Sequence, residues 1–265
     1  MEYNEHPVPA ILSGAVRCLW TLRGDPGAVS PEPQPVLPDG CAELILNSAE
    51  PFEEWEEGAW RKQPVRFLYG QITQAIRLRP AGATAMIGVR FHPWGVHRLF
   101  GADAVAEGKT PLDLIDGAMD QSMSVSLRDR PFPDAVPVVI GALAERPQQP
   151  VEPALLRFIQ ALQDPEAGPL ERLKAEVPLS ERQLERRFLA VVGLRPKLLA
   201  RIIRLRRAID LLHGGDVKGF AALAHAAGYF DQAHFNRDLK AFTGMPPRAY
   251  FKQDLLLPEY FSGVR

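Results

Sequence analysis

Cysteine is nearly absent from this sequence. Its 265 residues include only Cys18 and Cys41, which are too few for a disulfide framework or for a tetrahedral zinc site made of thiolates. The simplest interpretation is a pair of reduced, buried thiols, as is typical of cytoplasmic proteins. We therefore expect a cytoplasmic chain without disulfides.

Long apolar runs are also absent. None approaches the roughly 20 residues that a membrane-spanning helix requires, and the opening MEYNEHPVPA does not have the pattern of a signal peptide. We expect no contact with a membrane. The composition, 46% hydrophobic and 24% charged, is that of an ordinary globular protein, and the length suits about two domains.

The motifs that usually mark an enzyme or a metal site are missing. No Gly-rich phosphate loop and no G-x-S-x-G elbow occurs. His92 and His97 belong to no His-x-His pair, so we interpret them as structural residues and expect no metal and no cofactor. The four tryptophans leave two alternatives open, an apolar pocket or ordinary packing in the core and at the surface.

The charge is unevenly distributed along the chain. Residues 151–265 contain 18 Lys and Arg against 13 Asp and Glu, whereas residues 1–150 contain 13 against 19. Within 180–208 there are nine basic residues and only two acidic ones, Glu181 and Glu185. This asymmetry indicates a nucleic-acid-binding half joined to another domain, although a solvated basic helix face would give the same count.

Short β-type runs fill the first half. They are 41–47, 65–72, 75–80 and 84–93. Because Gly, Pro or Asn separates most of them, they predict an antiparallel sheet or a small barrel. The proline-rich residues 26–40 are expected to form a loop. Helical segments are expected at 94–101, 111–129 and 133–146.

Helical patterns dominate the second half. A proline-rich stretch at 145–153, where the charge balance changes sign, is predicted to be an interdomain linker. Residues 153–164 then place leucine and isoleucine on one helix face. Residues 196–212 carry apolar side chains at alternating four- and three-residue steps, which predicts one long helix with a single apolar stripe.

A capping pattern recurs in this half after 51 residues. Ser180 and Asp231 are residue types that cap the N-terminus of a helix. Gly193 and Gly244 stand at the matching C-terminal positions, where a left-handed cap favours glycine. We therefore expect two equivalent capped helices, at 181–192 and 232–243.

A shorter helical segment precedes each cap. These segments are 169–177 and 219–228. The unit of helix, brief turn and capped helix thus occurs twice and is joined by the long helix 196–212. This is the organisation of a tandem helix-turn-helix domain.

Each capped helix should present a polar front. At about 100° per residue, Leu184, Phe188 and Val191 share one face of the first helix and leave the opposite face to long hydrogen-bonding side chains. This is the layout of a recognition helix in the DNA major groove. Arg186 and Arg237, related by the 51-residue shift, suit bidentate contact with guanine. A surface arginine on an ordinary bundle is the alternative, but two copies at fixed spacing favour DNA binding.

Residues 153–253 resemble the AraC/XylS family of bacterial transcription regulators. FAALAHAAGYFDQAHFNRDLKAFTGMPPRAYF, from Phe220 to Phe251, follows the family's signature segment, and LSERQLERRFLAVVGLRP fits its Ser-x-x-x-Leu-x-Arg-x-Phe outline. The resemblance implies base and phosphate contacts from the fronts of both capped helices. The residues at these positions are Arg182, Glu185, Arg186, Gln232, Ala233, His234, Asn236 and Arg237.

Two positions depart from the family pattern. The family usually has Gly in the first turn, where this chain has EVPLS, and Pro178 implies an altered docking angle of the first unit. Ala233 stands at a position that is often polar, which implies that the second helix reads fewer bases.

The first half is similar to an uncharacterised sensor-type domain found ahead of such DNA-binding units. The likeness lies in VLPDGCAELILN, YGQITQAIRLRP and MIGVRFHPWGVHRLFG. We therefore expect a mostly-β (α+β) sensor or dimerisation domain at 1–148, an all-α DNA-binding domain at 149–256 and a tail at 257–265.

These observations predict a sequence-specific DNA-binding transcription regulator and not an enzyme. Its expected partners are double-stranded DNA and either a small-molecule effector or a second copy, bound through the N-terminal domain. The alternative is an enzyme of unknown chemistry in the N-terminal domain, with a helical appendage.

Overall fold

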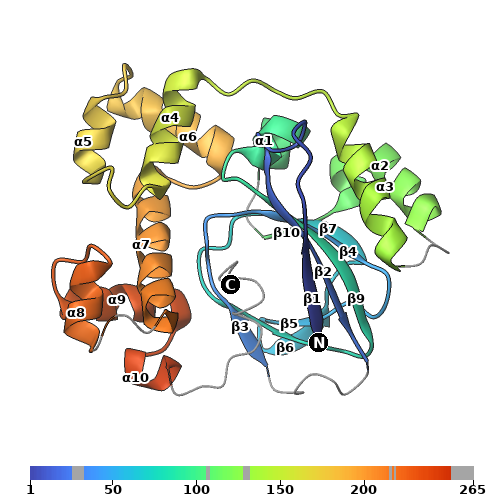
Figure 1. The fold of residues 1–265 in the computed structure, drawn as a ribbon, viewed down its shortest axis with the longest axis horizontal. Helices are drawn as coiled ribbons and strands as arrows, with labels where there is room; N and C mark the ends of the chain where they lie inside the picture. Colours follow the sequence, from blue (N-terminus) through green and yellow to red (C-terminus); the bar gives the residue numbers. More distant parts are fainter. Residues whose placement is uncertain (26–32, 106–107, 128–131, 215–216, 218, 252–265) are drawn as a thin grey trace.

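The computed structural model describes residues 1–25, 33–105, 108–127, 132–214, 217 and 219–251. The first half is built mainly from strands and the second half from helices (Figure 1). This is the predicted fold class, a mostly-β domain followed by a helical domain. None of the helices in the described residues is long and apolar enough to cross a membrane.

The N-terminal domain contains the strands and the first helices. The strands are β1 (Glu2–His6), β2 (Val16–Gly24), β3 (Gln34–Val36), β4 (Glu43–Asn47), β5 (Glu53–Glu56), β6 (Ala59–Lys62), β7 (Arg66–Tyr69), β8 (Ile76–Arg79), β9 (Thr84–Phe91) and β10 (Lys109–Pro111). The helices are α1 (Gly95–Phe100), the short 3-10 helix η1 (Ala102–Ala104), α2 (Leu112–Leu127) and α3 (Phe132–Ala144).

The strands form two antiparallel sheets, whereas the sequence predicted one antiparallel sheet or a small barrel. The larger sheet has the order β1-β2-β9-β4-β7-β10 and the smaller has the order β3-β8-β5-β6. Within the larger sheet, Trp20 of β2 lies opposite Gly88 of β9. A Cβ atom at position 88 would lie 1.9 Å from Cε2 of Trp20. Glycine therefore leaves the room that this fully buried indole occupies.

Each face of the larger sheet has its own apolar core. Residues such as Leu19 and Val89 on one face pack against α1, α2 and α3. Trp20, Phe67 and Met86 on the other face pack against residues of the smaller sheet. Alternate residues of a strand point to opposite faces, so one set of strands supplies both cores.

The prediction of a loop across residues 26–40 is wrong for its last part. Gln34–Val36 form β3, which pairs with β8. Because β3 lies at the edge of its sheet, Pro35 costs few ladder hydrogen bonds there. Residues 26–32 of the predicted loop lie outside the described residues.

The hairpin of β5 and β6 was also not predicted. Its turn residues Glu57 and Gly58 both have positive φ, 49° and 85°, as a two-residue type I′ turn requires. Glutamate is an unusual residue at the first of these positions, and the charged EEWEEGAWRK has no apolar alternation. The sequence therefore gave no hairpin signal.

The C-terminal domain contains the predicted helices and a short helix, α10, that was not predicted. They are α4 (Pro153–Gln163), α5 (Leu170–Ala175), α6 (Glu181–Val192), α7 (Pro196–His213), α8 (Phe220–Ala226), α9 (Gln232–Thr243) and α10 (Pro247–Tyr250). The pairs α5–α6 and α8–α9 are the two helix-turn-helix units, and α7 runs between them (Figure 1). The predicted stripe of α7 is confirmed at Ile202, Leu205 and Ile209, which are buried.

The two domains pack directly against each other. Leu37 and Trp94 of the N-terminal domain belong to the same apolar core as the helices of the C-terminal domain. Gly40, with φ 78°, lies so close to α7 that a Cβ atom there would be 2.6 Å from Cδ1 of Leu199. The segment from Leu37 to Gly40 therefore contacts the helix that joins the two helix-turn-helix units.

Candidate functional site

The caps of the two candidate recognition helices form as predicted. In α6 the Ser180 side chain accepts the N–H of Gln183, and the Gln183 side chain accepts the N–H of Ser180, which makes a capping box. In α9 the carboxylate of Asp231 accepts the N–H of His234 at 2.6 Å. Each helix thus has a fixed N-terminus, the part that reaches bases in a helix-turn-helix.

The C-terminal ends of both helices are capped by glycine. Gly193 follows α6 with φ 80°, and Gly244 follows α9 with φ 74°, so both adopt the left-handed conformation. This confirms the second half of the 51-residue repeat. The two helices therefore begin and end alike.

The front of α6 is open to solvent. Leu184 and Phe188 are buried on its back, whereas Arg182, Glu185 and Arg186 are exposed. These three side chains line a concave surface together with their neighbours. The residues of this surface are Ser180, Arg182, Gln183, Glu185, Arg186, Leu189 and Arg195. The predicted side chains of the first unit thus lie together on one accessible face.

The front of α9 is only partly exposed. Gln232, Ala233 and Arg237 are exposed, but His234 and Asn236 are half-buried. The His234 ring lies edge-on against Tyr229, with ring centroids 5.0 Å apart. Oδ1 of Asn236 is buried and has no hydrogen-bond partner among the described residues. Asn236 therefore faces outward less than the helical spacing suggested, because the adjoining helices partly cover it.

Ion pairs hold the two helices on the helices around them. Arg201 of α7 donates two hydrogen bonds to Oδ1 of Asp238 in α9, at 3.1 and 2.8 Å. Arg187 of α6 pairs with Glu152 just before α4. Such contacts restrict the rotation of α9 about its own axis, and with it the direction of its exposed side chains.

The N-terminal domain contacts the C-terminal ends of both helices. A Cβ atom at Gly193, just after α6, would lie 3.0 Å from Cγ1 of Val105. The backbone N–H of Ala75 donates a hydrogen bond of 2.6 Å to the carbonyl of Phe242 in α9. The exposed fronts lie toward the opposite, N-terminal ends, so these contacts leave them free.

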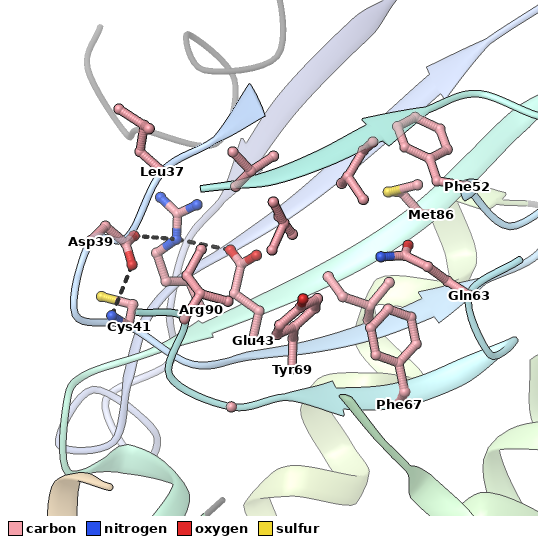
Figure 2. Close-up of a pocket in the computed structure, with 16 residues that line it drawn as sticks. Leu37, Asp39, Cys41, Glu43, Phe52, Gln63, Phe67, Tyr69, Met86 and Arg90 are labelled. Atoms are coloured by element: carbon pink, nitrogen blue, oxygen red, sulfur yellow. Dashed lines mark hydrogen bonds and ion pairs between the residues drawn. The ribbon is translucent and has the colours of Figure 1, made fainter. Parts of the chain in front are cut away.

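A cavity lies between the two sheets of the N-terminal domain (Figure 2). Its volume is about 50 Å³. Most of its wall is apolar, and six polar residues interrupt it. The lining residues are Val36, Leu37, Asp39, Cys41, Glu43, Ile45, Phe52, Gln63, Phe67, Tyr69, Gly70, Ile72, Ile76, Leu78, Met86 and Arg90.

The charged side chains of the cavity gather at one end. Nε of Arg90 donates to Oε1 of Glu43 at 2.8 Å and lies 3.6 Å from Oδ2 of Asp39 (Figure 2). Burial raises the pKa of the Glu43 carboxyl, and the Arg90 charge opposes this rise. Burial also raises the pKa of the Cys41 thiol to about 12, so this thiol stays protonated at neutral pH.

These cavity residues were not predicted from the sequence. Glu43 lies within the apolar run CAELILN and Arg90 within TAMIGVRFHP. The sequence did contain a signal: each of these two apolar runs includes one charged residue, and the two charges have opposite signs. Because a buried charge requires a partner, the two residues could have been expected to pair. Their pairing depends on the register that places Glu43 opposite Arg90.

The tryptophans pack instead of lining this cavity. Trp20 and Trp94 are buried in the cores, and none of the described lining residues is a tryptophan. Trp55 and Trp60 contact each other across the β5–β6 hairpin. Of the two alternatives that the sequence left open, the tryptophans therefore follow ordinary packing and do not line this cavity.

His92 and His97, which the sequence led us to interpret as structural residues, are both half-buried. The ring of His92 stacks on Trp94 at 4.8 Å, and burial lowers the pKa of both His92 and His97. Among the described residues, no group of three or more His, Cys, Asp or Glu side chains is placed to hold a metal ion.

Two family models match the chain. Residues 4–107 match the model described as "Domain of unknown function (DUF6597)", and residues 173–253 match the model described as "Helix-turn-helix domain". No curated protein matches the chain.

Solved structures of ToxT from Vibrio cholerae are similar to the chain. A 1.65 Å structure is 9% identical, with a TM-score of 0.41, and the match covers 95% of this chain and 98% of ToxT. A structure from strain O395 is 12% identical, with a TM-score of 0.43 and coverage of 88% and 95%. A structure with bound unsaturated fatty acid is 12% identical, with a TM-score of 0.40 and coverage of 87% and 90%.

The match to the helix-turn-helix model confirms the predicted helix-turn-helix domain in the C-terminal half. The matched helix-turn-helix region begins within α5 and ends after α10, and it contains both capped helices. The chain carries a helix-turn-helix domain of the AraC type, behind an N-terminal domain that matches the DUF6597 model.

Proposed function

We propose that the chain is a sequence-specific transcription regulator that contacts DNA with α6 and α9. The observation that carries this proposal is the repeated exposed front: Arg186 and Arg237 occupy equivalent positions on two equally capped helices. Paired recognition helices are the means by which helix-turn-helix proteins read major-groove base edges. The full set of proposed contact residues is Arg182, Glu185, Arg186, Gln232, Ala233, His234, Asn236 and Arg237.

The length of α7 supports binding to successive groove segments. Its 18 residues extend about 27 Å at 1.5 Å per residue. With the turns at either end, this approaches the roughly 34 Å of one duplex turn. One monomer then places α6 and α9 on the same face of the DNA.

We infer that the DNA-binding domain spans 149–256 and that residues 1–148 form an effector or dimerisation domain. The end of α3 at Ala144 and the start of α4 at Pro153 support the first boundary. The second boundary and the tail 257–265 lie outside the described residues. The lining of the cavity between the sheets supports a small-molecule effector, because ligand sites usually have mostly apolar walls with a few polar groups.

Selection of duplexes from a random library with the full-length chain tests this function. We expect one enriched motif with two half-sites about one helical turn apart. Binding of the motif, followed by fluorescence anisotropy, should weaken steeply as salt rises because Arg and Lys displace counterions from phosphate. Failure to enrich any motif, or binding that does not depend on salt, would contradict the proposal.

A further inference from the structure

Phe230 is the most exposed large apolar residue in the described part of the chain. It is 92% exposed and lies in the turn between α8 and α9. A ring in water adds nothing to the hydrophobic stabilisation of the fold. Single exposed apolar residues are common at protein surfaces, so the surroundings of Phe230 decide what it can contact.

The backbone of this turn is fixed on both sides of Phe230. On one side, the buried Tyr229 donates its N–H to the carbonyl of Ala224 at 2.9 Å. On the other side, the carboxylate of Asp231 accepts the N–H of His234 and caps α9. Phe230 is therefore held outward beside the N-terminus of α9, and its exposure does not come from a loosely attached loop.

The equivalent residue of the first unit has a packing role that Phe230 lacks. Leu179, which precedes the cap of α6, is partly buried and packs against the helical core. An apolar residue at this position often packs on the fourth residue of its helix. In the second unit Tyr229 makes that contact, since its ring centroid lies 5.5 Å from the ring of Phe235. Phe230 is therefore left free for another contact.

A second exposed apolar residue follows in the first turn of α9. Ala233 stands three residues after Phe230, and its equivalent in α6 is Arg182. The exposed residues beside them, Gln232 and Arg237, carry hydrogen-bonding side chains. The N-terminal end of α9 thus presents two apolar residues next to polar ones, whereas α6 has an arginine in the place of Ala233.

The major groove of DNA offers a matching apolar group. Thymine presents its C5-methyl group there, and alanine and phenylalanine are among the side chains that contact it. The N-terminal residues of a recognition helix are those that reach base edges. An apolar end of α9, with Arg237 beside it for a guanine or a phosphate, therefore suits a thymine in the groove better than an apolar protein surface, which would leave that arginine unpaired.

We propose that Phe230 and Ala233 read the C5-methyl group of thymine in the half-site of α9. This inference rests on the proposed function, and it adds Phe230 to the proposed contact residues. Ala233 takes part in base readout although its side chain forms no hydrogen bond. The two half-sites then differ in chemistry, because Arg182 of α6 seeks hydrogen-bond acceptors where α9 seeks a methyl group.

Replacing single thymines of the selected motif by deoxyuridine tests the readout, because this change removes only the methyl group. Binding of the full-length chain to each duplex is followed by fluorescence anisotropy. The half-site of α9 is the one whose base preference Arg237→Ala relaxes. We expect at least one thymine in that half-site whose replacement weakens binding about 4-fold, the value for one buried methyl group.

Three variants assign the methyl dependence to Phe230. In Phe230→Ala the effect of deoxyuridine should fall below about twofold, whereas Phe230→Leu keeps an apolar side chain and should keep most of the effect. Leu114→Ala is the matched control, since Leu114 is 75% exposed on α2 of the other domain, and it should behave as wild type. Thermal unfolding of Phe230→Ala should also match wild type, because the ring lies outside the core.

The outcomes separate this inference from the proposed function. A bound motif without a fixed thymine in the half-site of α9, or an unchanged effect of deoxyuridine in Phe230→Ala, would overturn the inference alone. An unchanged effect together with lost self-association of Phe230→Ala, measured by ultracentrifugation, would overturn it in favour of a contact between two copies. A chain that selects no duplex contradicts the proposed function and this inference with it.

Discussion

The N–H of Ala75 in the β-rich domain donates a hydrogen bond to the carbonyl of Phe242, near the end of the candidate recognition helix α9, at 2.6 Å. Residue 242 is equivalent by the 51-residue repeat to Val191 of α6, which lines a narrow space beside Val105 of the same β-rich domain. The N-terminal domain therefore contacts corresponding parts of both helices.

The first prediction concerns residues 149–265 as an isolated fragment. We expect it to fold, because its helices supply nearly all of their shared core, and to bind duplex DNA with a steep salt dependence. The free energy of unfolding of the fragment should be lower than that of the helical domain in the full chain, because the fragment lacks Leu37 and Trp94, which belong to that core. Circular dichroism and anisotropy measure both properties. An unfolded fragment would mean that the β-rich domain is required for folding of the helical domain.

The contact between Gly40 and Leu199 gives a second prediction. Gly40→Ala should lower the free energy of unfolding through both a left-handed φ and a clash at 2.6 Å. Gly58→Ala is the matched control: its φ is 85°, and a Cβ atom there has nothing within 4 Å. We expect about 1 kcal/mol for Gly58→Ala and about 1–3 kcal/mol more for Gly40→Ala.

A double-mutant cycle separates the two causes in Gly40→Ala. In a Leu199→Ala background the clash is absent, so Gly40→Ala should cost about as much as Gly58→Ala. Urea denaturation gives the four stabilities. If the extra cost persists without the Leu199 side chain, the contact with α7 is not its source.

The helical half could be predicted from sequence because its signals are local. Each capping residue acts within one turn of its own helix, so its effect does not depend on distant residues. The capping residues are Ser180, Asp231, Gly193 and Gly244. The apolar spacing of α6 and α9 likewise gives their buried faces without knowledge of the partner. Asn236 was less predictable, since its burial is decided by neighbouring helices.

The β-rich half was less predictable because its signals are not local. Strand β2 is buried over most of its length, so it lacks the alternation that marks a strand with one solvent face. The cavity depends on pairing between residues far apart, such as Glu43 and Arg90. Which charged residues meet is fixed by strand register, and the sequence does not contain register explicitly.

A third prediction uses the raised pKa of Glu43. Because burial raises this pKa above its value in the unfolded chain, the unfolded state loses the proton first as pH rises. Stability contributed by the protonated carboxyl is therefore lost from about pH 4.5 upward. The positive charge of Arg90 opposes the rise of this pKa, and the negative charge of Asp39 adds to it.

Glu43→Gln tests this because it holds the group in a neutral form. The stability of wild type relative to Glu43→Gln should fall as pH rises through this window. Glu53→Gln, on a half-buried carboxylate that pairs with Arg79 outside the cavity, serves as the control. Thermal unfolding between pH 4 and pH 8 gives the difference, and a wild type that gains stability relative to Glu43→Gln over this range would show that the Glu43 pKa is lowered.

The caps give a fourth prediction. The Asp231 side chain accepts the N–H of His234 at the start of α9, so Asp231→Ala should cost about 0.5–2 kcal/mol of stability. Asp231→Asn keeps an acceptor and should recover most of it. Equal losses in both variants, measured by urea denaturation, would mean that the cap hydrogen bond is not the cause.

The last prediction concerns how α6 and α9 divide the DNA site. If Arg186 and Arg237 each contact a base edge, replacing either with Ala should cost about 1–3 kcal/mol of binding and relax sequence preference within one half-site. The two variants should affect different base pairs, about one helical turn apart. Arg204 is unsuitable as a control, because its guanidinium lies over the Tyr229 ring at 5.4 Å and supports the second unit.

Arg172 is the better control for this experiment. Its side chain is 71% exposed on α5 and pairs only weakly with Glu176 at 3.4 Å. Arg172→Ala should reduce affinity uniformly across sequences or leave it unchanged, since any contact it makes is with phosphate. Footprinting and anisotropy on single-base variants of the selected motif give the pattern. If Arg186→Ala and Arg237→Ala alter the same base pairs, the two helices share one groove segment and the tandem arrangement is wrong.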